Sequence, residues 1–234
     1  MNVLIVHAHP EPQSFNGAMT RRAVAGLTAA GHRVQVSDLH AMGFDPVSDR
    51  RNFAGAKDPE YFKQQAEEMW ASEHDSFVPG IRAEMDKLRW CDLLVFQCPL
   101  WWFGLPAILK GWVDRVFAMG VAYGGGRWYS RGVFTGKRAV LSITTGGPAH
   151  LYSPDGLNGH IDSILFPIQH GMLYFTGFSV LPAQVGWSVA RLTPEEREAC
   201  LSAWETRLAG IWEEAPVPFP PLEAYDDRFQ LKRG

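Results

Sequence analysis

Residues 93–112, LLVFQCPLWWFGLPAILKGW, form the stretch around which the rest of the chain is arranged. They open with four apolar residues, and a run that is apolar on both sides predicts a buried central strand of a parallel sheet. The run breaks at Pro99, aromatic residues follow, and a helical pattern extends from about Leu105 to Phe117. Because parallel sheets bind ligands beyond the carboxyl ends of their strands, these aromatic residues are candidates for the wall of a flat ligand site. Packing beneath a loop explains them equally well.

Composition and charge exclude several classes of protein. The 234 residues are 46% hydrophobic and 20% charged, as in ordinary globular proteins, and the net charge of −3 gives no basic surface for nucleic acid. The three cysteines have neither disulfide-framework nor zinc spacing, which favours a reducing compartment. The first ten residues have no basic region, and their apolar run is too short to span a bilayer. We therefore expect a cytoplasmic protein without stable membrane insertion.

Strand and helix patterns alternate along the chain. Strands are expected near residues 2–7, 33–37, 92–97, 138–144 and 178–184, with a helix capped by Ser14 or Asn16 and others near 80–90, 105–117 and 193–213. Residues 41–82 are expected to be irregular and polar. The order predicts an α/β fold, a flavodoxin-like, doubly wound, five-stranded parallel sheet. We assign residues 1–184 to this domain, and 185–234 to a C-terminal helix and proline-rich tail packed on it as one structural unit.

Three loops follow the carboxyl ends of the predicted strands, at 9–16, 99–103 and 144–152. The first aims helix N–H groups at a phosphate, although an ordinary capped helix explains this loop better when it is considered alone. The chain lacks the GxGxxG fingerprint of dinucleotide-binding dehydrogenases. The second and third loops offer aromatic and small polar groups to a planar ring. Together the three loops fit a bound flavin.

Five segments resemble the NAD(P)H:quinone oxidoreductase family of the DT-diaphorase type. They are H-x-x-x-x-S-F-N (His9–Asn16), S-D-L-x-A-M-x-F (Ser37–Phe44), P-L-x-W-F-G-x-P-A-I-L-K-G-W (Pro99–Trp112), S-I-T-T-G-G (Ser142–Gly147) and P-I-Q-x-G-x-L-x-F-x-G-F (Pro167–Phe178). The resemblance implies a homodimer with shared active sites, tightly but non-covalently bound FAD, and NADPH or NADH as co-substrate. It also implies ping-pong chemistry, in which hydride passes from the nicotinamide to flavin N5 and then to a quinone or another flat acceptor.

The resemblance also implies roles for individual residues. The pyrophosphate would be held by His9, Ser14, Phe15 and Asn16, and the adenosine end by Arg197. The flavin ring would be walled by Pro99, Leu100, Trp101, Trp102 and Phe103, and its edge bonded by Thr144, Thr145, Gly146, Gly147 and Tyr152. The substrate slot would be lined by Tyr123, Phe175, Trp102 and Phe103.

Tyr152 and Asn158 are the candidate catalytic residues. Hydride arrival makes the flavin anionic near N1 and O2, and a phenol O–H placed there would stabilise the charge. One branch of the family has a His at the position of Asn158 that carries charge as imidazolium, whereas another branch also has Asn. His160 lies two positions after Asn158, and we do not assign it the role of that His.

Other departures from the family pattern affect metal binding and substrate choice. The branch with Asn binds zinc through two His and one Cys, but here only His170 matches, Tyr174 replaces the second ligand, and the tail has no Cys, so we predict no metal site. Trp101 replaces a common Gln and Gly125 replaces a Tyr, which leaves the preferred acceptor open. The C-terminal extension of the longer branch is missing, so the choice among NADPH, NADH and smaller donors is open as well.

Three alternatives to a quinone reductase remain open at this stage. One is a regulatory flavoprotein subunit of a membrane transporter, which co-purification with membrane fractions would reveal. A second is an azo or nitroaromatic reductase, because those acceptors are also flat and electron-poor. The third, a one-electron carrier, is disfavoured because a carrier needs an exposed flavin edge rather than an aromatic slot.

Overall fold

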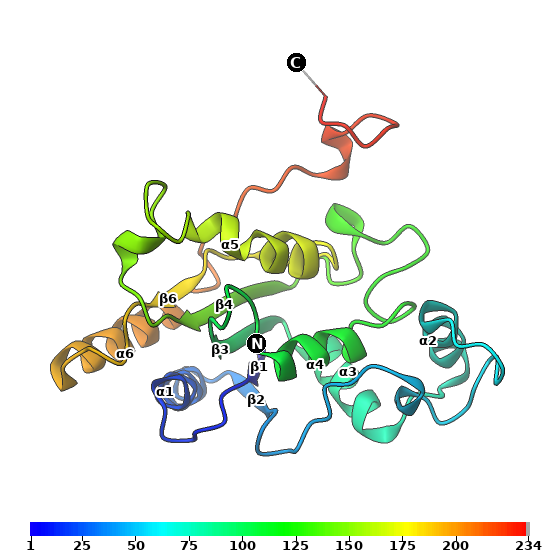
Figure 1. Cartoon of the computed structure of the whole chain (residues 1–234), viewed down its shortest axis with the longest axis horizontal. Coiled ribbons are helices and arrows are strands. Elements are labelled where there is room, and N and C mark those ends of the chain that lie inside the picture. The colour runs from blue at the N-terminus through cyan, green and yellow to red at the C-terminus, as the bar shows by residue number, and fades with distance from the viewer. Residues whose placement is uncertain (233–234) are drawn as a thin grey trace.

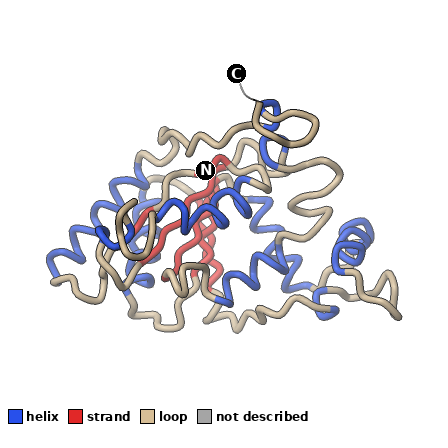
Figure 2. Tube along the Cα trace, turned by 45° about the horizontal axis from the view of Figure 1, so that its top comes forward, coloured by secondary structure: helices blue, strands red, loops and turns tan. Residues whose placement is uncertain are grey.

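The computed structural model describes residues 1–232 and contains one parallel sheet with helices on both faces (Figures 1 and 2). The strands lie in the order β2-β1-β3-β4-β5. The short β5 pairs with the start of β4, and β6 pairs with the carboxyl end of β4. They are β1 Asn2–His7, β2 Arg33–Asp38, β3 Leu93–Pro99, β4 Arg138–Thr144, β5 Ser179–Val180 and β6 Gln184–Gly186. All pairs are parallel, which confirms the predicted flavodoxin-like fold.

Side chains that alternate along the central strands divide the core into two layers. Val3 and Ile5 of β1 face the layer of α1 (Phe15–Ala29) and α6 (Pro194–Ala209). Leu4 and Val6 face the larger layer, which contains α3 (Pro79–Trp90), α4 (Ala107–Val116) and α5 (Ile161–Ile168). Because successive strand side chains point to opposite faces, an apolar run buried on both sides belongs in the middle of such a sheet.

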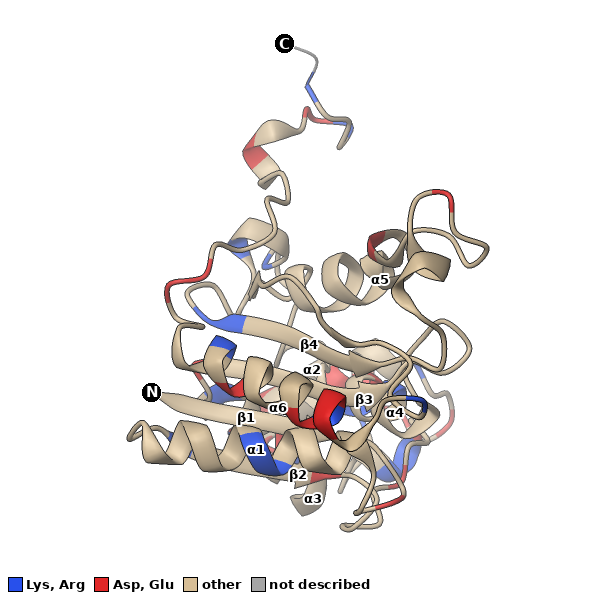
Figure 3. Cartoon of the chain, turned by 90° about the vertical axis from the view of Figure 1, so that its left-hand side faces the viewer, with Lys and Arg blue, Asp and Glu red and all other residues tan. Residues whose placement is uncertain are grey.

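Local signals account for the ends of α1 and α6. Ser14, rather than Asn16, is the N-cap of α1, and its hydroxyl accepts the N–H of Gly17 at 3.1 Å. Thr193 begins α6 with a capping box, in which its hydroxyl accepts the N–H of Glu196 and the Glu196 carboxylate accepts the N–H of Thr193. Figure 3 shows α1 and α6 side by side with charges of both signs, and Arg22 joins them through Glu198 at 2.7 Å and Glu205 at 3.2 Å.

Three segments differ from the sequence-based expectation. The irregular region expected at 41–82 contains α2 (Gln64–His74), whose buried face includes Glu67 and Glu68 and therefore lacks an apolar stripe. The strand expected at 178–184 is split into β5 and β6, and Pro182 lies between them without an N–H for the ladder. The helix expected at 193–213 ends at Ala209.

The remaining ordered segments lie on the α5 side of the sheet. A π-helical segment, Gln169–Tyr174, directly follows α5. The proline-rich tail passes β5, where the N–H of Val217 donates to the carbonyl of Val180, and then continues away from the sheet (Figure 1). In the part of the chain that the structure describes, no helix is both long and apolar enough to cross a bilayer.

Candidate active site

The loop between β1 and α1 presents the open N-terminus of a helix. Ser14 satisfies the N–H of Gly17, whereas the N–H groups of Phe15 and Asn16 belong to the first turn, where a helix offers no acceptor. A Cβ on Gly17 would lie 2.3 Å from the carbonyl oxygen of Pro12, so the loop needs glycine at this position to fold against the helix. His9 at the start of the loop accepts the N–H of Glu11 on Nδ1 at 3.0 Å. This geometry suits an anion such as a pyrophosphate.

The side chain of Asn16 connects this loop to the two neighbouring strands. It is buried, and its Nδ2 donates to Thr144 Oγ1 at 2.9 Å while its Oδ1 accepts from Gln97 Nε2 at 2.8 Å. The side-chain amide is therefore engaged inside the protein, and the group that Asn16 offers to a phosphate is its backbone N–H. These bonds fix the ends of β3 and β4 relative to α1.

The loop after β3 is a tight turn that carries three aromatic side chains. Trp101 and Gly104 exchange backbone hydrogen bonds at 3.1 and 2.9 Å, and the two residues between them, Trp102 and Phe103, have φ of 50° and 57°. Turns with positive φ at both central residues normally contain Asn or Gly, so bulky aromatic residues there carry strain. Trp101, Trp102 and Phe103 are 45%, 99% and 51% exposed, so the alternative that they pack beneath a loop does not hold.

The loop after β4 is held against both neighbouring segments. The N–H of Leu100 donates to the carbonyl of Thr144 at 2.8 Å, and the N–H of Thr145 donates to the carbonyl of Gly186 at 2.9 Å. Thr145 Oγ1 donates to the carbonyl of Gly147 at 2.8 Å, which closes the Thr-Thr-Gly-Gly turn. The predicted ring-edge residues Thr144, Thr145, Gly146 and Gly147 thus lie beside the base of the aromatic turn.

Tyr152 packs over this turn with an unengaged hydroxyl. Its side chain is 9% exposed, its ring centroid lies 5.3 Å from that of Trp187, and a Cβ on Gly147 would come within 3.3 Å of its ring. Within residues 1–232 its hydroxyl has no hydrogen-bond partner, so it is free to donate to a ligand. Asn158 donates its backbone N–H to the carbonyl of Leu151 at 2.9 Å, which ties its loop to the residue before Tyr152.

Sequence reasoning missed a fourth loop, which follows β6. Trp187 contacts Tyr152, and the N–H of Ser188 donates to the carbonyl of Gly147 at 3.2 Å. Ser188 Oγ is buried without a partner in the described chain, and Ser188 has a φ of 49°. Because β6 runs parallel to β4, its carboxyl end lies at the same edge of the sheet. The sequence pattern merges β6 with the preceding strand, so it gave no sign of a separate loop there.

The predicted adenosine contact, Arg197, and two of the four predicted substrate residues, Tyr123 and Phe175, lie outside the loops described above, whereas Trp102 and Phe103 lie in the aromatic turn. Arg197 is exposed in the first turns of α6. The ring centroids of Tyr123 and Phe175 are 5.6 Å apart, Tyr123 Oη accepts from Gln65 Nε2 at 3.2 Å, and burial raises the pKa of Tyr123. Both residues line a cavity of about 200 Å³ beside α4. Over residues 1–232, no hydrogen bond or ring contact joins this pair to the three predicted loops.

The region of the family zinc site contains aromatic rings. His170 stacks on Phe166 with centroids 4.6 Å apart and lies 5.5 Å from Tyr174. The described residues contain no group of three or more His, Cys, Asp or Glu side chains placed to hold a metal ion. The absence of a metal site stays a prediction.

Comparison with known proteins identifies the family. A family model described as a flavodoxin-like fold matches residues 1–208. The chain is 47% identical over 228 residues to NAD(P)H dehydrogenase [quinone] 1 of Cavia porcellus, covering 97% of this chain and 83% of that enzyme. The chain belongs to the NAD(P)H:quinone oxidoreductase family.

Two further relatives agree with this assignment. The human ribosyldihydronicotinamide dehydrogenase [quinone] is 44% identical over 217 residues, covering 92% of this chain and 94% of that enzyme. The crystal structure of a putative quinone reductase from Klebsiella pneumoniae superposes with a TM-score of 0.96 at 42% identity, covering 99% of this chain and 94% of the other. The resemblance inferred from the five sequence segments is therefore confirmed.

Proposed function

We propose that this quinone oxidoreductase reduces quinones by two electrons with NAD(P)H, through tightly bound FAD, in a homodimer whose copies share each active site. The aromatic turn at Trp101–Gly104 is the observation that supports the proposal most directly. A strained backbone that holds three exposed aromatic side chains at the carboxyl end of a central strand is suited to covering a flat ring.

The residues around this turn fit a flavin. The first turn of α1 offers N–H groups to a pyrophosphate, and the aromatic turn offers a wall for the ring system. The Tyr152 hydroxyl and the buried, unpartnered Ser188 Oγ supply polar groups for the ring edge. When bound, a flavin takes up a hydride from a nicotinamide and delivers it to an acceptor. Arg197, exposed on α6, is proposed to contact the adenosine end, which favours FAD over a mononucleotide.

The side chains contribute position, exclusion of water and charge stabilisation. Trp102 and Phe103 cover the ring face and orient the nicotinamide and the acceptor. The Tyr152 O–H donates to the negative charge that develops at the ring edge, and the Asn158 side-chain amide adds a second hydrogen bond from its loop. The bonds of Asn16 to Thr144 and Gln97 hold the loops that carry these groups in one arrangement.

A second copy of the chain completes the slot in this proposal. Tyr123 and Phe175 are in contact with each other but not with the flavin loops of their own chain. Trp102, at 99% exposure, is left without cover by its own chain. A dimer that brings the Tyr123–Phe175 pair of one copy to the aromatic turn of the other explains both observations.

The proposed compartment is the cytoplasm. Cys91, Cys98 and Cys200 are all free thiols, and burial raises the pKa of Cys91 to about 12, which makes this thiol inert. A reducing compartment suits this set of cysteines.

The cofactor and the kinetic order of the reaction test the proposal together. Heat-released cofactor is separated by chromatography, and initial rates are measured over a grid of NADPH, NADH and menadione concentrations. FAD with parallel double-reciprocal lines is expected. If the released cofactor is a mononucleotide, Arg197 has no adenosine to contact. Intersecting lines would contradict the ping-pong mechanism, in which donor and acceptor occupy the same slot one after the other.

A further inference from the structure

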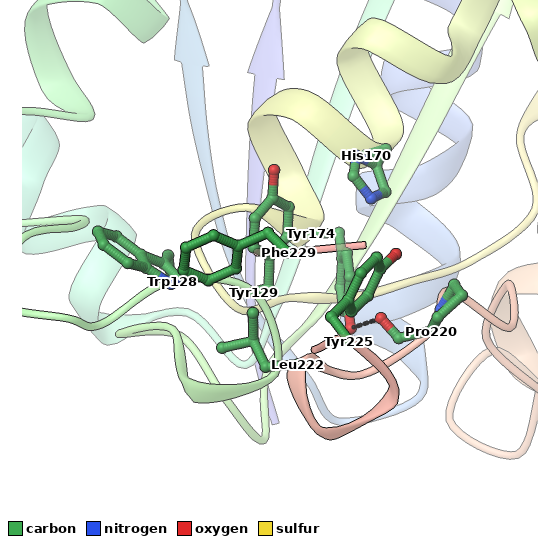
Figure 4. A pocket seen from close by; sticks show the side chains of 8 residues that line it. All are labelled: Trp128, Tyr129, His170, Tyr174, Pro220, Leu222, Tyr225 and Phe229. Atoms are coloured by element: carbon green, nitrogen blue, oxygen red, sulfur yellow. Dashed lines mark hydrogen bonds between the residues drawn. The ribbon is translucent and has the colours of Figure 1, made fainter. Parts of the chain in front are cut away.

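A cavity of about 380 Å³ lies between the π-helical segment and the C-terminal tail, apart from the flavin loops (Figure 4). This volume falls within the range of small-molecule sites. Five of its eight lining residues are aromatic, and a histidine is a sixth ring: Trp128, Tyr129, His170, Tyr174, Pro220, Leu222, Tyr225 and Phe229. None of them belongs to the three loops proposed to hold the flavin.

Polar contacts fix the tail that forms one wall of this cavity. Tyr174 Oη donates to the carbonyl of Pro220 at 3.0 Å, as the dashed line in Figure 4 marks. The N–H of Leu222 donates to Ser130 Oγ at 3.0 Å, and Arg131 pairs with Glu223 at 2.8 Å. The tail is therefore attached at Pro220, Leu222 and Glu223, so this wall of the cavity is held in place without a ligand.

The opposite wall is fixed by the main chain and by ring packing. The N–H of Tyr129 donates to the carbonyl of Phe175 at 2.8 Å, and the Tyr129 ring meets that of Phe175 edge-on with centroids 5.3 Å apart. His170 stacks on Phe166 with an interplanar angle of 10°. Tyr129 thus separates the cavity from the Tyr123–Phe175 pair on its other side.

The lining offers hydrogen bonds but no charge. No Asp, Glu, Lys or Arg lines the cavity, so a charged ligand would lose its hydration without compensation. Burial lowers the pKa of His170, which keeps the imidazole neutral at neutral pH and able to donate or accept. In the chain as described, neither the His170 imidazole nor the hydroxyls of Tyr129 and Tyr225 make a hydrogen bond.

We propose that this cavity is a second small-molecule site, for a neutral, flat aromatic compound of one or two rings that carries a hydroxyl or carbonyl group. The rings stack among the aromatic walls, and the polar group bonds to His170 or to a neighbouring tyrosine hydroxyl. A metal ion does not suit the cavity because His170 is the only strong metal ligand in its lining.

Fluorine NMR titration of the flavin-loaded protein with 6-fluoro-2-naphthol tests this site. His170→Phe keeps the ring and removes its hydrogen bonds, and Leu222→Trp fills the cavity. His74→Phe is the matched control, because His74 stacks on Trp70 at 4.6 Å outside the cavity. We expect the wild type and the control to bind equally, His170→Phe to bind about fivefold more weakly and Leu222→Trp at least about tenfold more weakly.

A second probe separates hydrogen bonding from shape. 2-Fluoronaphthalene has the same rings but no hydroxyl, so its affinity should be unchanged in His170→Phe and reduced in Leu222→Trp. If Leu222→Trp fails to fold, Phe229→Ala, which opens the wall from the exposed tail, must weaken binding instead. The proposal is overturned if the wild type shows no saturable binding of the naphthol. It is also overturned if His170→Phe or the cavity variant binds the naphthol as well as the wild type, because the probe then occupies the flavin slot or another surface.

Discussion

At the residue scale, the proposed site depends on side chains whose polar groups are left for a ligand. Tyr152 combines a buried ring with a free hydroxyl, which is the arrangement expected of a donor held ready for developing charge. The family resemblance implies a role for this residue, but its contact with Trp187 could not be predicted, because that contact joins segments that lie far apart in the chain.

Tyr152→Phe removes the O–H and keeps the ring. We expect flavin content to be unchanged and reduction of the flavin by NADPH to slow by about 10- to 100-fold, because one donor to the developing charge is lost. Stopped-flow absorbance measures this rate. Tyr61→Phe, at an exposed residue, is the control and should react as the wild type. An unaltered rate in Tyr152→Phe would remove the residue from the mechanism.

Trp102 holds a strained backbone without packing against its own chain, since its φ is 50° and it is 99% exposed. Trp102→Gly should therefore raise the unfolding free energy of the flavin-free protein by about 1 kcal/mol, because glycine adopts this conformation freely. The same substitution should weaken flavin binding by removing part of the ring wall. Denaturant melts and flavin titrations measure the two effects, and a loss of stability would show that Trp102 supports the fold rather than the ligand.

The residue scale also marks a limit of sequence reasoning. Asn16 was predicted as a phosphate ligand from its place in the H-x-x-x-x-S-F-N motif. Its side chain bonds to Thr144 and Gln97, which come from two strands, so the backbone N–H is the group that Asn16 has left for a phosphate. A motif shows that a residue type is required at a position, but the direction of its side chain depends on neighbours that only the folded structure brings together.

At the scale of elements, α2 is the helix that the apolar pattern of the sequence did not predict. Glu67 lies on its buried face and accepts the N–H groups of Lys57 and Asp58 at 2.6 and 2.9 Å, so it holds the preceding loop. Glu68, also buried, accepts the N–H of Met119 at 2.7 Å. Buried acidic residues with backbone partners give a helix no apolar stripe, so hydrophobic periodicity could not reveal it.

Glu68 gives α2 a defined dependence on pH. Burial raises the pKa of Glu68 above its usual value of 4.5, so just above pH 4.5 the folded state holds a proton that the unfolded state releases. The contribution of Glu68 to stability is then greatest at low pH and falls as pH rises through the raised pKa. Relative to wild type, Glu68→Gln should gain stability between pH 4 and 8.

Chemical denaturation at several pH values measures this trend. Glu73→Gln, at an exposed position of the same helix, is the matched control and should follow the wild type. A stability difference between Glu68→Gln and wild type that does not change with pH would contradict the raised pKa.

Elements with strong local signals were predicted well. The apolar run of β3 and the cap of α6 depend on neighbouring residues, and both are found close to where the patterns indicate. β5 and β6 were merged in the prediction because β6 has three residues and is defined by its pairing with β4. That merger also hid the loop that carries Ser188.

At the scale of the whole molecule, the proposed dimer joins two residue groups from different chains. If each site combines the flavin loops of one chain with Phe175 of another, variants impaired in different groups should rescue each other. In a mixed dimer of Tyr152→Phe and Phe175→Ala, one site carries both changes and the other carries neither.

Refolding these two variants together in equal amounts should restore about a quarter of wild-type activity, because half of the dimers are mixed and half of their sites are intact. Steady-state menadione reduction measures the recovery. The control mixture, Tyr152→Phe with Trp102→Gly, changes the flavin loops of both chains and should recover nothing. Absence of rescue in the first mixture would place the complete site within one chain.

The most direct test of the central claim is an anaerobic absorbance titration of the purified protein, first with NADPH and then with menadione. We expect a flavin band that one equivalent of NADPH per chain bleaches fully and one equivalent of menadione restores. Flavin that NADPH leaves oxidised would contradict the proposed donor. A protein that neither contains flavin nor takes it up would contradict the assignment of the aromatic turn and its neighbouring loops as a flavin site.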